Sequence, residues 1–100
     1  YSQCSLHDIH VSQLQTGVTQ HGKKEWSVTI TNWCPCVQTN VMLNCTGFQS
    51  VEQIEPSLLK VSGNVCLVSS GQPIWKGAIE FNYAWDHPFP FIPISSDISC

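Results

Sequence analysis

Residues 78–85 read Ala-Ile-Glu-Phe-Asn-Tyr-Ala-Trp and carry the clearest structural signal in the chain. Large apolar side chains occupy every odd position of this segment, and the even positions hold Glu80, Asn82 and Ala84. A period of two is typical of a β-strand that buries one face. The pattern therefore predicts a central strand whose large side chains lie in the core.

The stretch that follows, residues 86–93, holds three prolines and two phenylalanines. Proline lacks a backbone N–H donor and fixes φ, so this stretch predicts an edge strand or a polyproline-like extension. Before the predicted strand, Trp75 lies between a turn and a glycine, where a large ring is difficult to bury. We therefore expect Trp75, Phe89 and Phe91 to be exposed contact residues, because such aromatic patches mark interfaces.

Other segments alternate in the same way. In residues 26–31, Trp26, Val28 and Ile30 alternate with hydroxyl side chains that we expect to face solvent. Trp26 and Trp85 are in phase with their apolar neighbours, so both are expected in the core. Shorter strands are predicted at residues 8–12, 41–45 and 65–68. Six or seven short strands with almost no helix predict an all-β fold, an antiparallel β-sandwich or barrel.

Two segments interrupt the alternation. Residues 16–24 hold two glycines and are mostly polar, which predicts a loop. In residues 51–60 the apolar spacing resembles a helical stripe, and Pro56 restricts it to one short helix or 3₁₀ turn. Two carboxylates here, Glu52 and Glu55, are expected to be solvated surface.

Six cysteines are spread over the whole chain: Cys4, Cys34, Cys36, Cys45, Cys66 and Cys100. A chain of this length folds to a surface of roughly 5,700 Å² and buries about 65% of its extended surface, which leaves a thin core. An even number of cysteines in such a chain predicts three disulfides, each contributing about 2–4 kcal/mol. A bridge within Cys34-Pro35-Cys36 would be strained, so these two cysteines are expected to bond to different partners, and the remaining connectivity stays open.

Trp33, which precedes Cys34, is expected to pack on a disulfide. A metal site is the weaker alternative, because structural zinc normally takes two pairs of Cys or His ligands spaced as Cys-x2–4-Cys, and the chain has a single Cys-x-Cys.

Length and charge limit the class of function. One hundred residues predict a single domain, residues 1–100. With four Lys, no Arg and a net charge of −3, the chain lacks the basic surface that nucleic acids and anionic membranes bind. No apolar run approaches the roughly 20 residues that span a bilayer, and no leader precedes Tyr1, so we expect a mature soluble protein without membrane insertion. The chain has none of the usual catalytic motifs, so neither catalytic residues nor a cofactor is expected.

The triplet Asn44-Cys45-Thr46 matches the acceptor sequence for N-linked glycosylation. It predicts a glycan on Asn44. Disulfides and N-glycans both form in the secretory pathway, so the two predictions agree on an extracellular protein.

Several motifs together resemble the plant tapetum determinant-like family. They are the segments 28–36, 45–50, 66–68 and 81–84, with Cys100 at the end of the chain. The resemblance covers nearly the whole chain and places all six cysteines in register. One departure is the single residue between the second and third cysteines, where the best-known members have a wider gap.

The resemblance implies a secreted, cysteine-rich signalling protein. The best-known members are ligands of a leucine-rich-repeat receptor kinase in anther cell-fate decisions, so the partner expected by resemblance is such a receptor ectodomain in the apoplast. Trp75, Phe89 and Phe91 are then the expected receptor-binding residues. A glycosyltransferase activity is not expected, because the chain is too short for a nucleotide-sugar fold and has no Asp-x-Asp motif.

Two other classes remain as alternatives. A carbohydrate-binding module of the plant cell wall would have the same small secreted β-sandwich, with three coplanar rings on its surface. A small disulfide-rich inhibitor or defence protein is the third class, and the net charge of −3 argues against membrane lysis.

Overall fold

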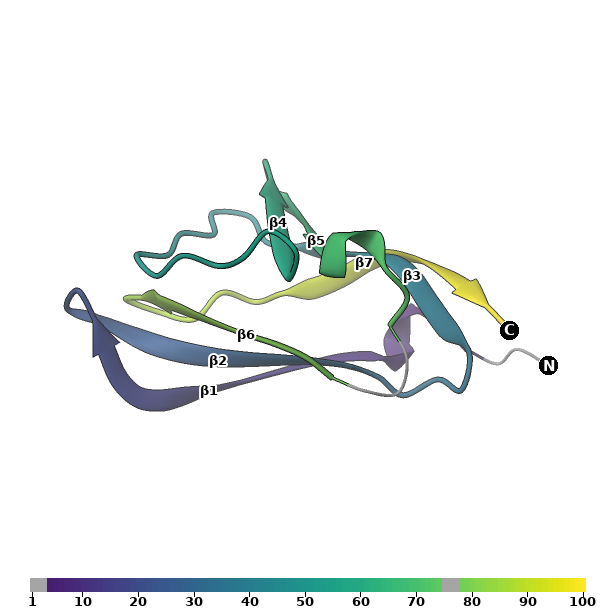
Figure 1. Ribbon diagram of the computed structural model, residues 1–100, viewed down its shortest axis with the longest axis horizontal. Coiled ribbons are helices and arrows are strands. Elements are labelled where there is room, and N and C mark those ends of the chain that lie inside the picture. Colours follow the sequence, from purple (N-terminus) through teal and green to yellow (C-terminus); the bar gives the residue numbers. More distant parts are fainter. Residues whose placement is uncertain (1–3, 75–77) are drawn as a thin grey trace.

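The computed structural model describes residues 4–74 and 78–100. In these residues the chain forms seven strands in two antiparallel sheets, which confirms the predicted all-β sandwich. The three-stranded sheet has the order β1 (Ile9–Gln20), β2 (Lys23–Asn32) and β6 (Ala78–Trp85). The four-stranded sheet has the order β4 (Leu59–Ser62), β5 (Val65–Val68), β3 (Val37–Asn44) and β7 (Ile92–Ser99). The two sheets form two layers (Figure 1).

Helix in the described residues is limited to two 3₁₀ turns, η1 (Leu6–Asp8) and η2 (Ser69–Gly71). Neither is long and apolar enough to cross a membrane.

The core lies between the two layers and follows the predicted alternation. Val28 and Ile30 of β2 face Val41 and Leu43 of β3, and all four are fully buried. The remaining core side chains come from both sheets and from the connections: Ile9, Cys45, Leu59, Cys66, Val68, Ile74, Phe81, Tyr83, Phe89 and Phe91. Trp26 and Trp85 pack against this core and are half-buried, so each contacts the core and keeps a solvent-exposed part.

β6 lies at an edge of its sheet, so the prediction of a central strand is wrong. In the described residues it pairs with β2 alone, and β2 is the central strand. The other edge of β6 is covered by a loop: the Val51 N–H donates to the Ala84 carbonyl at 3.0 Å, and the Ala84 N–H donates to Ser50 Oγ at 3.0 Å. A loop that pairs with the edge gives β6 the burial of a central strand, which is why the sequence pattern did not distinguish the two.

The β1–β2 hairpin extends through residues 16–24, so the prediction of a loop there is wrong. The connection is the two-residue turn His21-Gly22, with φ of 51° and 80°. Positive φ at both positions is typical of the tight turn that matches the twist of paired strands. The segment is polar because this end of the hairpin is exposed, and exposed strands need no apolar alternation.

The apolar stripe in residues 51–60 forms one turn and no helix. The Leu58 and Leu59 N–H groups both donate to the Glu55 carbonyl, at 2.8 and 3.1 Å. Ile54, Leu58 and Leu59 pack on the core from this loop. The apolar spacing therefore corresponds to side chains with which this segment packs on the core, and not to one face of a helix.

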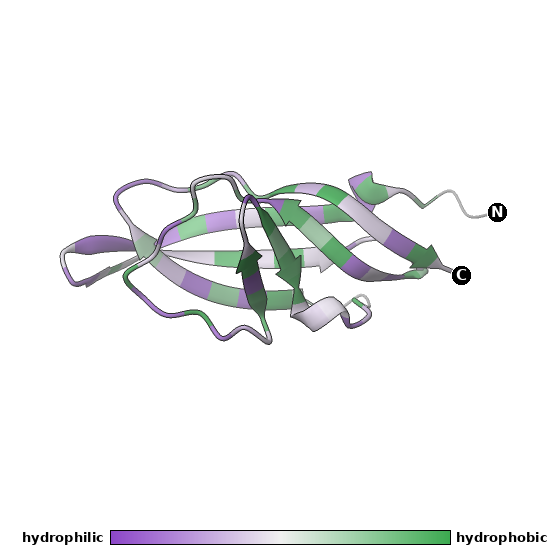
Figure 2. Ribbon diagram, turned by 90° about the horizontal axis from the view of Figure 1, so that it is seen from above, coloured by the Kyte–Doolittle hydropathy of each residue, from purple (hydrophilic) through white to green (hydrophobic). Residues whose placement is uncertain are grey.

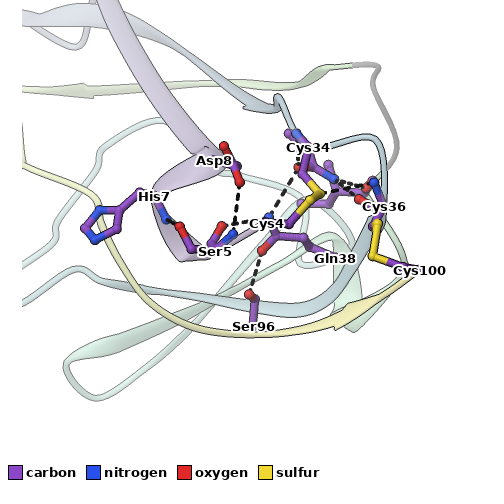
Figure 3. Close-up of a disulfide and its surroundings, with 11 residues drawn as sticks. Cys4, Ser5, His7, Asp8, Cys34, Cys36, Gln38, Ser96 and Cys100 are labelled. Atoms are coloured by element: carbon purple, nitrogen blue, oxygen red, sulfur yellow. Dashed lines mark hydrogen bonds between the residues drawn. A yellow bond between two sulfur atoms is a disulfide. The ribbon is translucent and has the colours of Figure 1, made fainter. Parts of the chain in front are cut away.

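Three disulfides join Cys4 to Cys34, Cys36 to Cys100, and Cys45 to Cys66. As predicted, Cys34 and Cys36 bond to different partners. The first two bridges lie close together and fasten the start and the end of the described chain to the connection between β2 and β3 (Figure 3). The third bridge lies in the core, between the end of β3 and β5.

A buried polar network lies beside these bridges. Gln38 and Asn32 are fully buried, and each has its amide groups bonded. Gln38 accepts a hydrogen bond from Ser96 Oγ at 2.6 Å and donates to the Ser5 carbonyl at 3.2 Å (Figure 3). Asn32 Nδ2 donates to the Ile74 carbonyl at 2.9 Å. Gln38 Nε2 also donates to Asn32 Oδ1 at 3.3 Å, which joins the two sheets, and these partners offset the cost of removing the amides from water.

Candidate interaction surface

Phe89 and Phe91 are buried, with 6% and 3% of their surface exposed, so the prediction of an exposed patch there is wrong. The connection from β6 to β7 crosses from one sheet to the other (Figure 1), and both rings belong to the core. The Phe48 ring meets them at centroid distances of 5.2 and 5.4 Å. Burial of a phenylalanine side chain contributes about 1.5–3 kcal/mol, and the extended proline-rich backbone aligns both rings for it. The third predicted contact residue, Trp75, lies outside the described residues.

Trp33 is the aromatic residue that the described part of the chain exposes most, with 64% of its surface in solvent. Its ring stacks on His10, with centroids 3.5 Å apart and an interplanar angle of 21°. Its backbone N–H donates to the Asp8 carbonyl at 2.9 Å, and the next residue, Cys34, is bonded to Cys4. An exposed tryptophan that is already held in place loses little conformational entropy when a partner covers it.

The surroundings of Trp33 form one continuous surface on the outer face of the three-stranded sheet. The register pairs His10 with Thr31 and Leu14 with Ser27, and Leu14 is 64% exposed. We call this the Trp33 surface, and its members are His10, Ser12, Leu14, Ser27, Thr29, Thr31 and Trp33. None of these residues is a Lys, Asp or Glu, and the charged neighbour on the same face is Glu80 of β6, which pairs with Thr29 and is exposed. Apolar anchors surrounded by hydroxyl groups are typical of a protein interface in which charged residues are depleted.

The alternation of side chains along β2 already indicated the Trp33 surface in the sequence. Residues 27, 29 and 31 form the hydroxyl face of β2, and position 33 continues the same odd-numbered series. This alternation predicts that the Trp33 ring points outward, toward solvent. The proximity of Trp33 to Cys34 suggested packing on a disulfide, whereas the ring lies against His10.

A second cluster joins two carboxyl groups, one on β2 and one on the loop that covers the β6 edge. Glu25 is buried with 7% of its surface exposed, and Thr16 Oγ1 donates to its Oε1 at 2.7 Å. The carboxyl group of Glu52 lies beside that of Glu25, and each shifts the pKa of the other. The bonds from Thr16 and then from Glu52 lower the pKa of Glu25. Burial, followed by the bond and the charge of Glu25, raises the pKa of Glu52 to about 7.

Burial beside a second carboxyl group favours the protonated form of Glu52. Its Oε1 is buried without a hydrogen-bond partner, and the other carboxyl group faces it. Two carboxylates in contact cannot both ionise without a large penalty. The sequence predicted that Glu52 and Glu55 are both solvated surface. The fold instead half-buries Glu52 beside Glu25.

The sulfur atoms of Cys4, Cys34 and Cys36 lie within 4.8 Å of one another, a spacing that a metal ion could bridge. Each is bonded in a disulfide. None therefore offers the thiolate that a metal requires. This cluster is part of the covalent frame.

The fold and the surface together define a class of protein: a small β-sandwich held by three disulfides, with an ordered surface rich in hydroxyl groups around an exposed tryptophan. Within the class, residues 5–100 match the family model described as Tapetum determinant 1, C-terminal. The chain belongs to this family, and the predicted resemblance is confirmed. Membership implies a signalling protein of plant reproductive development. No curated protein and no solved structure shows significant similarity to the chain.

Proposed function

We propose that this protein is secreted to the apoplast and acts as a ligand of a leucine-rich-repeat receptor kinase ectodomain in plant reproductive development. Family membership over residues 5–100 is the observation that carries the proposal. Three disulfides support an oxidising, extracellular location. The protein acts by being recognised, without catalytic turnover.

The Trp33 surface is the docking face of this proposed ligand. A standard interface covers about 800 Å² of each partner, or about one seventh of the 5793 Å² surface of the protein. The three-stranded sheet supplies such an area on a rigid element. Trp33 and Leu14 are its exposed apolar anchors, and hydroxyl groups on β2 supply hydrogen bonds.

The test is capture of receptor ectodomains from plant extracellular fluid and membranes with the oxidised protein as bait, followed by affinity measurement. We expect a leucine-rich-repeat ectodomain to bind, and Trp33→Ala to raise Kd about tenfold or more. Ile94→Ala is the control, because Ile94 is 45% exposed on β7 of the opposite sheet. Equal affinity of Trp33→Ala and the parent would remove the Trp33 surface from the proposal. Capture of polysaccharide without any receptor would contradict the ligand role.

The carbohydrate-binding alternative is less well supported. It requires three coplanar rings on the surface, and in residues 4–74 and 78–100 the stacked surface pair is Trp33 with His10. A single stacked pair with one indole is a small platform for a polysaccharide chain.

A further inference from the structure

The outer face of the four-stranded sheet is hydrophobic. Leu43 and Cys66 point into the core, so their neighbours on β3 and β5 point outward. We call this the apolar face, and its members are Met42, Val65, Leu67 and Ile92. Ile92 is 55% exposed, and the other three are half-buried. Figure 2 looks onto this sheet, where β5 is coloured as hydrophobic along its length.

The apolar face also has a hollow. Met42, Val65 and Leu67 line a depression of about 410 Å³, and Lys60 and Ser62 of β4 complete its rim. An exposed apolar area with a polar rim is typical of a binding surface.

Asn44, the last residue of β3, lies on this face between β5 and β7. The register pairs it with Val65 on one side and with Ile92 on the other, and its side chain is exposed. The Thr46 N–H and Oγ1 both donate to Asn44 Oδ1, at 3.1 and 2.6 Å. The carboxamide oxygen is thus turned toward the chain, and its nitrogen is the group left for a new bond.

We propose that Asn44 carries an N-linked glycan whose first sugars lie on the apolar face, which leaves the opposite sheet for the receptor. The proposal rests on the proposed secretion of the protein. The donor is a lipid-diphosphate oligosaccharide: a bond forms between Asn44 Nδ2 and the anomeric carbon, Nδ2 loses one proton, and the lipid diphosphate leaves.

Sugar chemistry fits this surface. The C–H groups of a pyranose form an apolar side, and its hydroxyl groups reach solvent or polar residues at the edge. Met42, Val65 and Leu67 match the apolar side, and Lys60 and Ser62 match the hydroxyl groups. A glycan here would replace exposed apolar surface by a solvated one.

The test compares Thr46→Ser, which keeps the acceptor triplet, with Thr46→Ala, which removes it. Both are secreted from a eukaryotic host, and their masses report glycan occupancy. Met42 is the sole methionine of the chain, so its oxidation by dilute hydrogen peroxide reports access to the apolar face. We expect the glycosylated parent and Thr46→Ser to oxidise at least about threefold more slowly than Thr46→Ala.

Secretion without a glycan on Asn44 would overturn the proposal, and so would equal Met42 oxidation with and without the glycan. Asn44→Gln repeats the comparison if Thr46→Ala fails to fold. Concentration-dependent dimerisation of the glycosylated protein through Met42 would assign the face to a second copy and would also overturn it. Mass and oxidation need no receptor, so these results are independent of the receptor-binding experiment.

Discussion

At the scale of single residues, one proton on Glu52 controls part of the stability. In the folded protein the pKa of Glu52 is raised from 4.5 to about 7 by burial and by Glu25. Between these two pH values the unfolded chain loses the Glu52 proton and the folded chain keeps it. The folded state therefore loses stability as the pH rises from about 4.5 through 7. The lowered pKa of Glu25 acts in the opposite direction, and its contribution is lost as the pH falls below about 4.5.

We predict that Glu52→Gln removes most of this decline, because a glutamine amide donates to Glu25 at every pH. Urea unfolding over a pH series is the measurement. The parent is expected to lose about 1–2 kcal/mol between pH 4.5 and 7.5, after allowance for solvent screening, and the variant less. Glu55→Gln, an exposed change outside the pair, is the control and should follow the parent. A Glu52→Gln profile parallel to that of the parent would contradict the shared proton.

At the scale of elements, the edge of β6 depends on the loop that covers it. Ser50 Oγ accepts from the N–H groups of Ala84 and Glu52, at 3.0 and 3.1 Å, and donates to the Glu52 carbonyl. Ala84 is fully buried, so its N–H has no access to water when this bond is lost. One hydroxyl group thus holds the loop on the strand and positions Glu52 for its contact with Glu25.

Ser50→Ala is therefore expected to cost about 1–3 kcal/mol of unfolding free energy, because it leaves a buried N–H without a partner. It should also expose the β6 edge and increase self-association, which light scattering detects. The matched control is Ser57→Ala in the same loop, whose exposed hydroxyl bonds to Glu55 at 3.4 Å; it should stay within about 0.5 kcal/mol of the parent. Equal stability of the two variants would show that the loop does not depend on Ser50.

At the scale of the whole molecule, the disulfides have two different structural roles. The Cys45–Cys66 bridge is buried and packs as a core residue. The Cys36–Cys100 bridge closes a span of 64 residues and fastens the end of β7, an edge strand of the four-stranded sheet. Long spans restrict the unfolded chain most, so this bridge stabilises through the unfolded state.

Removal of the Cys36–Cys100 bridge by the double change to Ala is expected to cost about 4 kcal/mol in urea unfolding. The aromatic core should stay intact in near-UV circular dichroism, because Phe48, Phe89 and Phe91 lie away from that bridge. Hydrogen exchange should accelerate at residues 97–99 of β7. Unchanged exchange there would show that strand pairing alone holds the C-terminal end.

Local patterns in the sequence were sufficient to predict several features of this protein. Alternation in residues 26–31 and 78–85 predicted which faces of β2 and β6 are buried, because a strand places successive side chains on opposite faces. The cysteine count and the strain within residues 34–36 predicted three bridges with separate partners. The motifs predicted the family.

Other features depended on contacts between distant segments. Phe89 and Phe91 looked exposed from their prolines, and only the crossing between the two sheets, with Phe48 against them, placed both rings in the core. The Glu25–Glu52 contact joins residues on different elements, and no local period encodes such a pair.

The sequence by itself determined several of the strands, the buried faces of those strands and the presence of disulfides, because these depend on the two-residue period of a strand and on the chemistry of cysteine. The tertiary structure alone decided which strand is central, which aromatic rings are exposed and which carboxyl groups meet. Those outcomes depend on how the sheets stack, which brings together residues that are tens of positions apart in the chain.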